Sequence, residues 1–362
     1  GSSTRRDRDE RIQGARVKYE AEGVGAGAAE ERVLALWRRL PSPPKPEMFR
    51  WCYREGSTGE GHCFLLKAAG DDPELVGTPG PRARGPLRAA LLGGFFVDKA
   101  HRTLFPALTL QRAVLAWTRQ GFDLLYGFPN ESAAPVLKRL GFKDLVKLSR
   151  HVLVLRHARY LAPVLKSDLA ARVAAIPIDL ARRVAQPGTA WPAPRGLVFE
   201  EITSLDARFD RLFAARAFPE LTTGMRDAAL LSWRFLRRPD EATTVYALSA
   251  KRSRELHGYA IVHYDGVTAH VRDLLGVDLE AMTATLRLTA GAARKTGASA
   301  LSFLFAGPRE MSARLHALGF RERPTTRVLI GHAGDSLTKD PAKADVLPLL
   351  ERWYVTEADE DQ

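Results

Sequence analysis

The sequence is poor in cysteine, in long apolar runs and in blocks of like charge. Cys52 and Cys63 are its only cysteines, and two thiols are too few for a structural zinc site or a disulfide framework. The uncharged apolar run at residues 89–97 is about half as long as a membrane-spanning helix requires. We therefore expect a protein of the reducing cytoplasm with no structural metal and no transmembrane segment.

The net charge is +12, from 54 Lys and Arg against 42 Asp and Glu. An anionic cofactor, nucleic acid or an anionic membrane surface would each account for such an excess. The charge is spread along the chain in short groups such as Arg5-Arg6 and Arg237-Arg238, without the motifs of nucleic-acid-binding proteins. Nucleic acid is therefore not an expected partner, and peripheral membrane contact stays open. An arginine-rich proteome explains the excess equally well.

An internal repeat divides the chain into two halves. Trp51 and Trp233 each open a short aromatic motif that precedes a predicted strand. The motif Leu-Gly-Phe ends at Phe142 in the first half and at Phe320 in the second. These landmarks, and others between them, recur in the same order at offsets of roughly 176–182 residues. A chain of 362 residues is long enough for two domains, so we interpret the repeat as a duplication.

Strand-like and helical patterns alternate within each half. In the first half we expect a strand at residues 91–97, a helix at 107–120, a strand at 122–128, a helix at 131–140 and a closing strand at 143–155. Apolar residues recur at helical spacing in the first of these helices, and Gly141 ends the second. The alternation predicts an α/β layer architecture.

The same patterns divide the chain into five segments: an N-terminal extension at 1–29, a first domain at 30–156, a linker at 157–197, a second domain at 198–335 and a C-terminal tail at 336–362. The linker begins as a helix with an apolar stripe and basic neighbours. We expect this stripe to pack on one of the domains, and a place on a membrane surface is the alternative. The stripe consists of Leu161, Val164, Leu165, Leu169 and Val173.

An ordered series of motifs gives the chain a resemblance to a known family. The matching stretches lie at residues 96–102, 106–112, 126–130 and 140–142, with further matches at 233–235 and 353–356. Over about residues 30–356, the chain resembles the GNAT superfamily of acyl-CoA N-acyltransferases, and more narrowly the tandem-GNAT proteins associated with bacterial exopolysaccharide clusters. The resemblance implies an α/β fold of two tandem GNAT-like mixed-sheet domains.

The resemblance also implies a binding site for acetyl-CoA or a longer acyl-CoA. In the family, a loop of the form Arg/Gln-x-x-Gly-x-Gly/Ala presents backbone amides at a helix start to the pyrophosphate, where the positive helix end favours an anion. Here Phe105 stands in place of the glycine, while Pro106 suits the first turn of a helix. Either the loop still binds the cofactor, or the fold is a scaffold that has lost it. The implied cofactor-binding residues are Val97, Arg102, Thr103, Leu104, Phe105 and Ala107.

Acyl transfer to an amine requires a polarised carbonyl, a base for the amine and an acid for the leaving thiolate. In the family a backbone N–H polarises the carbonyl, and here it would belong to Val97 or a neighbour. Asp98 and His101 are the local candidates for the base, and Tyr126 is the candidate acid. Asn130 would hold the cofactor or the acceptor. The structural alternatives are a turn cap for Asp98, a solvated loop position for His101, a packed core tyrosine for Tyr126 and a helix cap for Asn130.

The second half lacks the phosphate-binding loop. Its corresponding stretch carries Asp278 and Glu280, whose carboxylates would repel phosphates at close range. Asp273 lies in an otherwise apolar predicted strand, and a buried charge requires a partner. It would bind the acceptor in a cleft between the domains, or it would form a structural ion pair.

Three functions compete at this point. The first is acyl-CoA-dependent N-acyl transfer to a small amine or amino sugar by direct attack of the amine on the thioester. The second is aminoacyl transfer from charged tRNA, as in proteins of the FemABX type, which also pair two GNAT-like domains. The third is a catalytically inactive tandem module that binds a sugar, a peptide or a protein.

Overall fold

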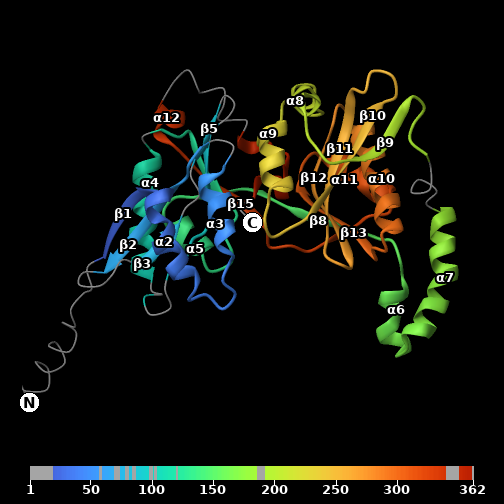
Figure 1. Cartoon of the computed structure of the whole chain (residues 1–362), viewed down its shortest axis with the longest axis horizontal. Coiled ribbons are helices and arrows are strands. Elements are labelled where there is room, and N and C mark those ends of the chain that lie inside the picture. The colour runs from blue at the N-terminus through green and yellow to red at the C-terminus, as the bar shows by residue number, and fades with distance from the viewer. Residues whose placement is uncertain are drawn as a thin grey trace, which may run out of the picture.

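The computed structural model describes residues 19–56, 59–68, 74–77, 81–83, 87–97, 101, 104–119, 121–185, 192–339 and 350–360. Two α/β halves lie side by side (Figure 1), as the repeat predicts. The first half runs from β1 to β8, a helical hairpin of α6 and α7 follows, and the second half runs from β9 to the C-terminal end. The expected α/β architecture is confirmed.

The first half starts with a strand that the sequence did not predict. Its elements are β1 (Tyr19–Gly25), α2 (Ala26–Trp37), α3 (Pro46–Phe49), the π-helical turn η1 (Arg50–Arg54), β2 (His62–Ala68), β3 (Glu74–Gly77), β4 (Pro81–Ala83), β5 (Arg88–Leu92), α4 (Leu104–Thr118), β6 (Leu124–Gly127), α5 (Ala134–Arg139), β7 (Lys143–Lys147) and β8 (Ser149–Val154). The hairpin consists of α6 (Ala158–Leu165) and α7 (Asp168–Ala185).

The second half repeats this order. Its elements are β9 (Leu197–Ile202), α8 (Ala207–Ala214), α9 (Ala228–Leu231), the π-helical turn η4 (Ser232–Leu236), β10 (Thr243–Ala250), β11 (Leu256–Tyr264), β12 (Thr268–Gly276), α10 (Leu279–Lys295), β13 (Ala300–Ala306), α11 (Arg309–Ala317), β14 (Arg321–Arg323), β15 (Val328–Ala333), α12 (Asp335–Lys339), β16 (Val355–Thr356) and the short helix η6 (Glu357–Asp359). Every residue of β13 is buried, as in a strand covered on both faces.

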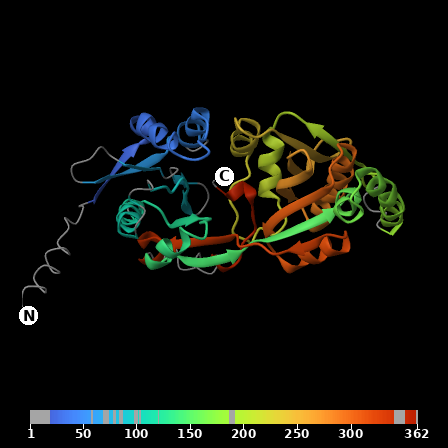
Figure 2. The same ribbon diagram turned by 90° about the horizontal axis from the view of Figure 1, so that it is seen from below.

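Each half contributes one strand to the sheet of the other. The first sheet has the order β4-β5-β6-β15-β7, so that β15 from the second half lies between two strands of the first. The second sheet has the order β14-β8-β13-β12-β11-β10-β9, so that β8 from the first half lies between two strands of the second. Figure 2 shows β8, in green, crossing from one half into the other. A third, small sheet contains β1, β2 and β3.

This exchange corrects the prediction of one closing strand at residues 143–155. The segment forms two strands in two sheets, and buried Leu148 lies between them. β7 pairs with β15, whereas β8 pairs with β13 and β14. Periodicity along one segment cannot reveal the change, because a strand pattern does not specify which sheet the strand joins.

The centre of the duplication is marked by the two tryptophans that reveal it in the sequence. The ring nitrogen of Trp51 donates to the carbonyl oxygen of Trp233 at 2.7 Å, and that of Trp233 donates to the carbonyl oxygen of Trp51 at 2.8 Å. Their rings stack with centroids 4.9 Å apart. The reciprocal pair indicates a local twofold relation between the halves.

Replacement of either tryptophan by phenylalanine should therefore destabilise the protein. Trp51→Phe keeps an aromatic ring but removes one buried donor, and we expect a loss of about 1–3 kcal/mol in the free energy of unfolding. Chemical denaturation followed by circular dichroism measures this loss. Trp233→Phe is the matched variant and should cost a similar amount, because its hydrogen bond is the mirror of the first. A loss confined to one of the two variants would contradict the reciprocal arrangement.

The two faces of the first sheet have different surroundings. Ala90, Leu92 and Leu125 pack in a cluster with residues of α4, on one face. Residues that alternate with them, such as Leu91 and Leu124, pack in another cluster with Trp353 and Val355 near the C-terminal end. The second face is therefore turned toward the second half of the molecule.

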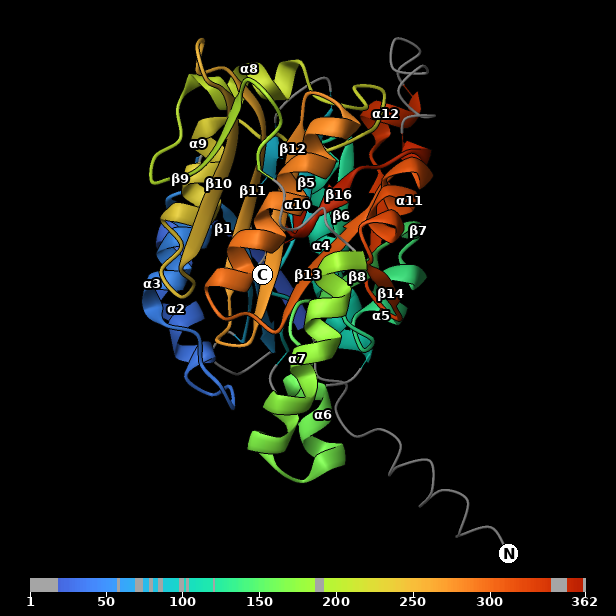
Figure 3. The same ribbon diagram turned by 90° about the vertical axis from the view of Figure 1, so that its right-hand side faces the viewer.

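The linker stripe has a different environment from the one expected. Val164, Leu165, Leu169 and Val173 are all exposed, with 76% of Val164 and 74% of Leu169 accessible to solvent. The prediction that the stripe packs on one of the domains is wrong. α6 and α7 contact each other and project from the end of the molecule (Figure 3).

Candidate functional site

Strands β5 and β6 are the parallel pair from which a GNAT-like site would be built. Their pairing runs from Ala89 opposite Leu124 to Leu92 opposite Gly127. A Cβ atom on Gly127 would lie 3.1 Å from the Cβ atom of Leu92 and 3.2 Å from its carbonyl oxygen, so a larger residue here would be tightly packed against Leu92. Beyond Leu92 the chain turns at Gly94, whose φ of 64° lies in the left-handed region. The strand therefore ends earlier than the 91–97 range predicts.

The start of helix α4 lies close to β1. Phe105 is 58% exposed, so its side chain is directed outward from the helix start, where glycine is expected by resemblance. Its ring lies 6.2 Å from that of Tyr19, between centroids. The Tyr19 hydroxyl and Nδ1 of His101 are 2.9 Å apart and share a hydrogen bond. His101 thus contacts a tyrosine at the helix start.

Only some of the other residues named for the cofactor site lie within the described part of the chain. Asp98, Arg102 and Thr103 lie outside the described residues. Leu104 is the first residue of α4, and Ala107 is buried in its first turn, which gives the helix a start three residues earlier than 107–120 predicts. Val97 is partly buried and packs against the same cluster as α4. Leu104, Phe105 and Ala107 therefore belong to the first turn of the helix rather than to a loop before it, and their role in cofactor binding stays a prediction.

Tyr126 borders a cavity between the two halves. It lies in the middle of β6, opposite Leu91 on one side and Gly331 on the other. The cavity has a volume of about 330 Å³ and is lined from the first half by residues that include Leu87, Ala89 and Tyr126. The second half contributes the segment 219–226 together with Phe213, Arg216 and Leu230, and the C-terminal end contributes Trp353, Val355, Ala358 and Asp359. A cavity of this size can enclose a small ligand.

Arg216 lines this cavity, and its hydrogen bonds in the described contacts are to carbonyl oxygens. Its guanidinium donates to the carbonyl oxygens of Phe213 and Pro219, and it lies 4.5 Å from the Phe213 ring centroid. Burial and the charge of Arg226 lower the pKa of Arg216, although Glu220 opposes the shift. Arg216 and Thr223 belong to the polar part of the lining, to which Glu220, Arg226 and Asp359 also contribute, and apolar side chains line the rest.

Asn130 occupies a turn rather than the cavity wall. Its side-chain oxygen accepts hydrogen bonds from the backbone N–H of Ala133 and from the Ser132 hydroxyl, both at 2.9 Å. These contacts are those of a residue that caps the turn before α5. The turn moves the helix start to Ala134, three residues later than predicted.

The corresponding strands of the second half diverge around the C-terminal end of the chain. β12 and β13 pair from Thr268 opposite Ala300 to Val271 opposite Phe303. Beyond that point β13 pairs instead with β16, where Phe305 lies opposite Thr356. The Tyr354 hydroxyl donates to the carbonyl oxygen of Leu274 on β12 at 2.5 Å. Residues 353–360, here called the C-terminal segment, thus fill the opening between the two strands.

A buried ionic network holds the C-terminal segment in place. Arg226 is 1% exposed and contacts Asp273 at 2.9 Å and Asp359 at 2.6 Å. Asp273 also accepts hydrogen bonds from the hydroxyls of Tyr259 and Thr356, at 2.6 and 2.7 Å. Burial opposes the charge of Arg226, but the two carboxylates raise its pKa well above the usual value. Asp273 is 0% exposed, and its predicted role in acceptor binding stays a prediction.

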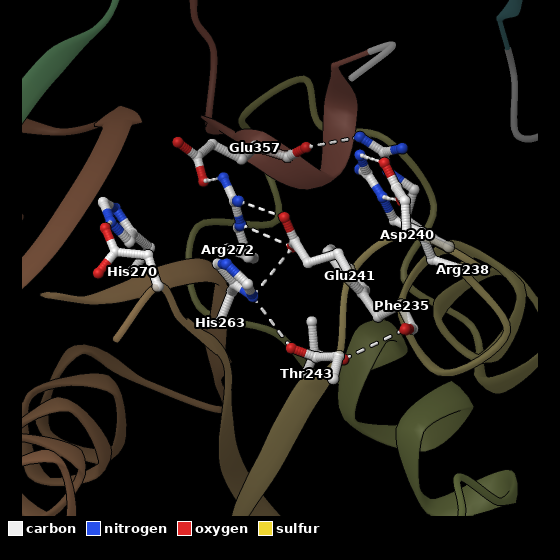
Figure 4. A network of polar contacts seen from close by, with 12 residues as sticks. Phe235, Arg238, Asp240, Glu241, Thr243, His263, His270, Arg272 and Glu357 are labelled. Carbon is white, nitrogen blue, oxygen red and sulfur yellow. Dashed lines mark hydrogen bonds and ion pairs between the residues drawn. The ribbon is translucent and has the colours of Figure 1, made fainter. Parts of the chain in front are cut away.

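Arg272 holds the same segment from the opposite face of β12. Its guanidinium donates to the carboxylate of Glu357 at 2.6 Å and to that of Glu241 at 3.0 Å (Figure 4). Burial opposes the charge of Arg272, and Glu357 and Glu241 outweigh it and raise the pKa. Two neighbouring residues of one strand therefore bind the C-terminal segment on two sides.

The helix start of the second half is also closed to an anion. The Asp278 side chain accepts a hydrogen bond from the backbone N–H of Ala281 at 2.7 Å and caps α10. Glu280 adds a second carboxylate to the first turn. The carboxylates satisfy and shield the amides that would otherwise attract a phosphate, so the geometry of this half does not fit an acyl-CoA.

Cys63 is not an activated nucleophile. Burial is the main reason that the pKa of the Cys63 thiol is raised to about 12, with Cys52 and Glu60 as further causes. A thiol needs a lowered pKa to react as a thiolate at neutral pH. Within the described parts of the chain, no group of His, Cys, Asp and Glu side chains could hold a metal ion.

The sequence did not single out several residues that build the cavity and the network. Arg226 lies in a loop without any periodic pattern, and its two carboxylate partners are 47 and 133 residues away along the chain. Trp353 belongs to a stretch that carries the family resemblance, but nothing in that stretch places it against the first sheet.

Comparisons with known proteins place the fold. No family model matches the sequence, and no curated protein matches it. Among solved structures, a GCN5-related N-acetyltransferase from Anabaena variabilis ATCC 29413 is similar at a TM-score of 0.59 and 12% identity, covering 87% of this chain and 73% of that one.

Two further solved structures are similar to this chain in fold. A conserved protein of unknown function from Enterococcus faecalis V583, described as a probable N-acyltransferase, has a TM-score of 0.58 at 12% identity over 89% of this chain and 74% of its own. A GCN5-related N-acetyltransferase from Kribbella flavida has a TM-score of 0.53 at 14% identity over 88% of this chain and 71% of its own. The predicted fold of two GNAT-like domains is confirmed.

Proposed function

We propose that the chain is an acyl-CoA-dependent N-acyltransferase that acts on a small amine or amino-sugar acceptor by direct attack of the amine on the thioester. The cavity between the halves carries this proposal, because it borders Tyr126 on the strand pair β5–β6. The likeness in fold to N-acetyltransferases supports it. An association with exopolysaccharide synthesis would fit an amino-sugar acceptor.

The residues of the first half fit an acyl-CoA better than those of the second. Phe105 is directed outward, which leaves the backbone at the start of α4 free of its bulk. The proposed pyrophosphate contacts are those that the family resemblance assigns to the phosphate-binding loop: Arg102, Thr103, Leu104, Phe105 and Ala107. When bound, the cofactor supplies a thioester whose carbonyl a backbone N–H at Val97 would polarise.

The proton transfers would be divided between residues that precede α4 in the sequence and Tyr126 on β6. His101 or Asp98 would accept the proton of the attacking amine, and Tyr126 would donate a proton to the leaving thiolate. Asn130 would hold the turn that follows β6. The acceptor would occupy the cavity beside Tyr126, so that the second half serves as a wall of the acceptor site.

Blocking this cavity tests the acceptor site separately from the cofactor site. Thr223→Phe should fill part of the cavity and lower the acceptor-dependent rate at least ~10-fold, while the affinity for acetyl-CoA stays unchanged. The rate is measured as thiol release with glucosamine and a panel of small amines, and the affinity by calorimetry. Thr268→Phe is the control, because Thr268 is half-buried but does not line the cavity.

The outcomes separate the competing functions. Failure to bind any acyl-CoA, from acetyl to long-chain, would contradict the proposal and favour the inactive binding module. Binding of charged tRNA in place of acyl-CoA would favour aminoacyl transfer. A Thr223→Phe variant with unchanged transfer would show that the acceptor binds elsewhere.

A further inference from the structure

Exposed apolar side chains are concentrated on the helical hairpin of α6 and α7. Of the ten large apolar side chains that are exposed among the described residues, eight lie on the hairpin, and the other two are Phe105 and Tyr264. The eight are Tyr160, Val164, Leu165, Leu169, Val173, Ile176, Ile178 and Leu180. Single exposed apolar residues are ordinary on a protein surface, but a contiguous group of them marks an interaction site.

The exposed residues of α7 form one stripe along the helix. Leu169, Val173, Ile176 and Leu180 follow one another at spacings of four, three and four residues, which places them on one face. Their exposed fractions lie between 59% and 74%. Ala171 and Ala175 are buried, on the side of the helix away from the stripe. The hairpin therefore has one small-residue face packed inward and one aliphatic face turned to solvent.

The net positive charge of the hairpin indicates what kind of surface would cover this stripe. Residues 156–185 contain six basic and two acidic side chains, which gives a net charge of +4 with histidine neutral. Two copies of the chain packed stripe to stripe would bring these like charges together. An anionic surface would attract them, and the charge of the whole chain, +12, acts in the same direction.

We infer that the α6–α7 hairpin docks the protein on an anionic lipid bilayer, with the aliphatic stripe of α7 in the interfacial region. An amphipathic helix with a basic flank and an aliphatic face lies in the plane of such a membrane. No helix among the described residues is both long and apolar enough to cross a bilayer, so the contact is peripheral. The hairpin projects from the end of the molecule (Figures 1 and 3), where the body does not obstruct a flat surface.

Flotation of the full chain with vesicles tests this inference. We expect the protein to float with vesicles that contain phosphatidylglycerol and to stay behind with vesicles of phosphatidylcholine alone. Higher salt should weaken the binding, because the electrostatic attraction is screened. The double variant Val173→Asp/Ile176→Asp should lower the bound fraction at least ~10-fold. Val173→Ser/Ile176→Ser, which adds no charge, should lower it less.

The control variant is Tyr264→Asp, which changes an exposed apolar residue on β11 outside the hairpin and should float as the unchanged chain does. Thermal melts show whether each variant is folded. Absence of flotation with anionic vesicles would overturn the inference, as would full flotation of the folded Asp double variant. A dimer in light scattering that the double variant abolishes, without vesicle binding, would show instead that the stripe joins two copies of the chain.

Discussion

Arg226→Met is expected to lower the free energy of unfolding by about 3–5 kcal/mol, the usual cost of removing one partner from a buried ion pair. Arg226 is 1% exposed and lies between the carboxylates of Asp273 and Asp359. Methionine has a similar length but no charge, so the two carboxylates would be left buried without their cation. Chemical denaturation monitored by tryptophan fluorescence measures the loss.

The variant should also acquire a particular dependence on pH. A buried carboxylate without a cation holds a proton more tightly in the folded chain than in the unfolded chain. Lowering the pH therefore favours the folded state of the variant, and part of the lost stability should return between about pH 7 and about pH 5. A loss of stability that is independent of pH would show that packing, rather than charge, is the main contribution of Arg226.

Arg314→Met provides the matched control. Arg314 pairs with Glu280 at the surface, where 49% and 71% of the two side chains are exposed. Exposed ion pairs contribute about 0–1 kcal/mol, because water and salt screen them. An equal loss in the two variants would contradict the assignment of the Arg226 network as the contact that fixes the C-terminal segment.

Phe105→Glu is expected to weaken acyl-CoA binding by about 100-fold, which corresponds to about 2.7 kcal/mol. The prediction depends on the proposed function, in which phosphates lie at the start of α4. A carboxylate at this point would repel them. The fold should not suffer, since Phe105 is 58% exposed and an acidic residue in the first turn interacts favourably with the helix dipole. Calorimetry with acetyl-CoA and a thermal melt measure the two effects.

Phe105→Gln separates charge from size. Its side chain is as long as that of Glu but neutral, so it should retain most of the affinity. Phe105→Gly would restore the residue of the family loop and should bind acyl-CoA more tightly than the unchanged chain. If Phe105→Glu binds as well as Phe105→Gln, the phosphates do not lie at this helix start.

The repeated motifs could be found in the sequence because the structural features behind them depend on residues that are close together in the chain. Gly141 and Gly319 end their helices in the left-handed conformation, both with a φ of 91°, and Asp278 caps α10 with its own side chain. Each of these features depends on a residue and its near neighbours. The α/β alternation and the position of α4 could therefore be predicted to within a few residues.

Only part of the candidate site could be predicted from the sequence. The sequence identified Tyr126 and the start of α4, but it could not show that Tyr126 borders a cavity while His101 contacts Tyr19. Such differences depend on which face of a strand or loop meets the other half of the molecule, and one sequence does not contain that information. For Asn130, in contrast, the cap that the sequence offered as the structural alternative is the contact observed.

The sequence by itself determined the duplication, the alternation of strands and helices, the absence of a phosphate-binding loop in the second half and the amphipathic character of the linker. Tertiary structure alone decided the exchange of β8 and β15, the burial of Asp273 with Arg226, and the exposure of the α7 stripe. Local patterns specify which side chains must be covered. They do not specify what covers them, because strands with the same alternation fit either sheet, and a buried charge or an apolar stripe meets its partner through contacts distant in sequence.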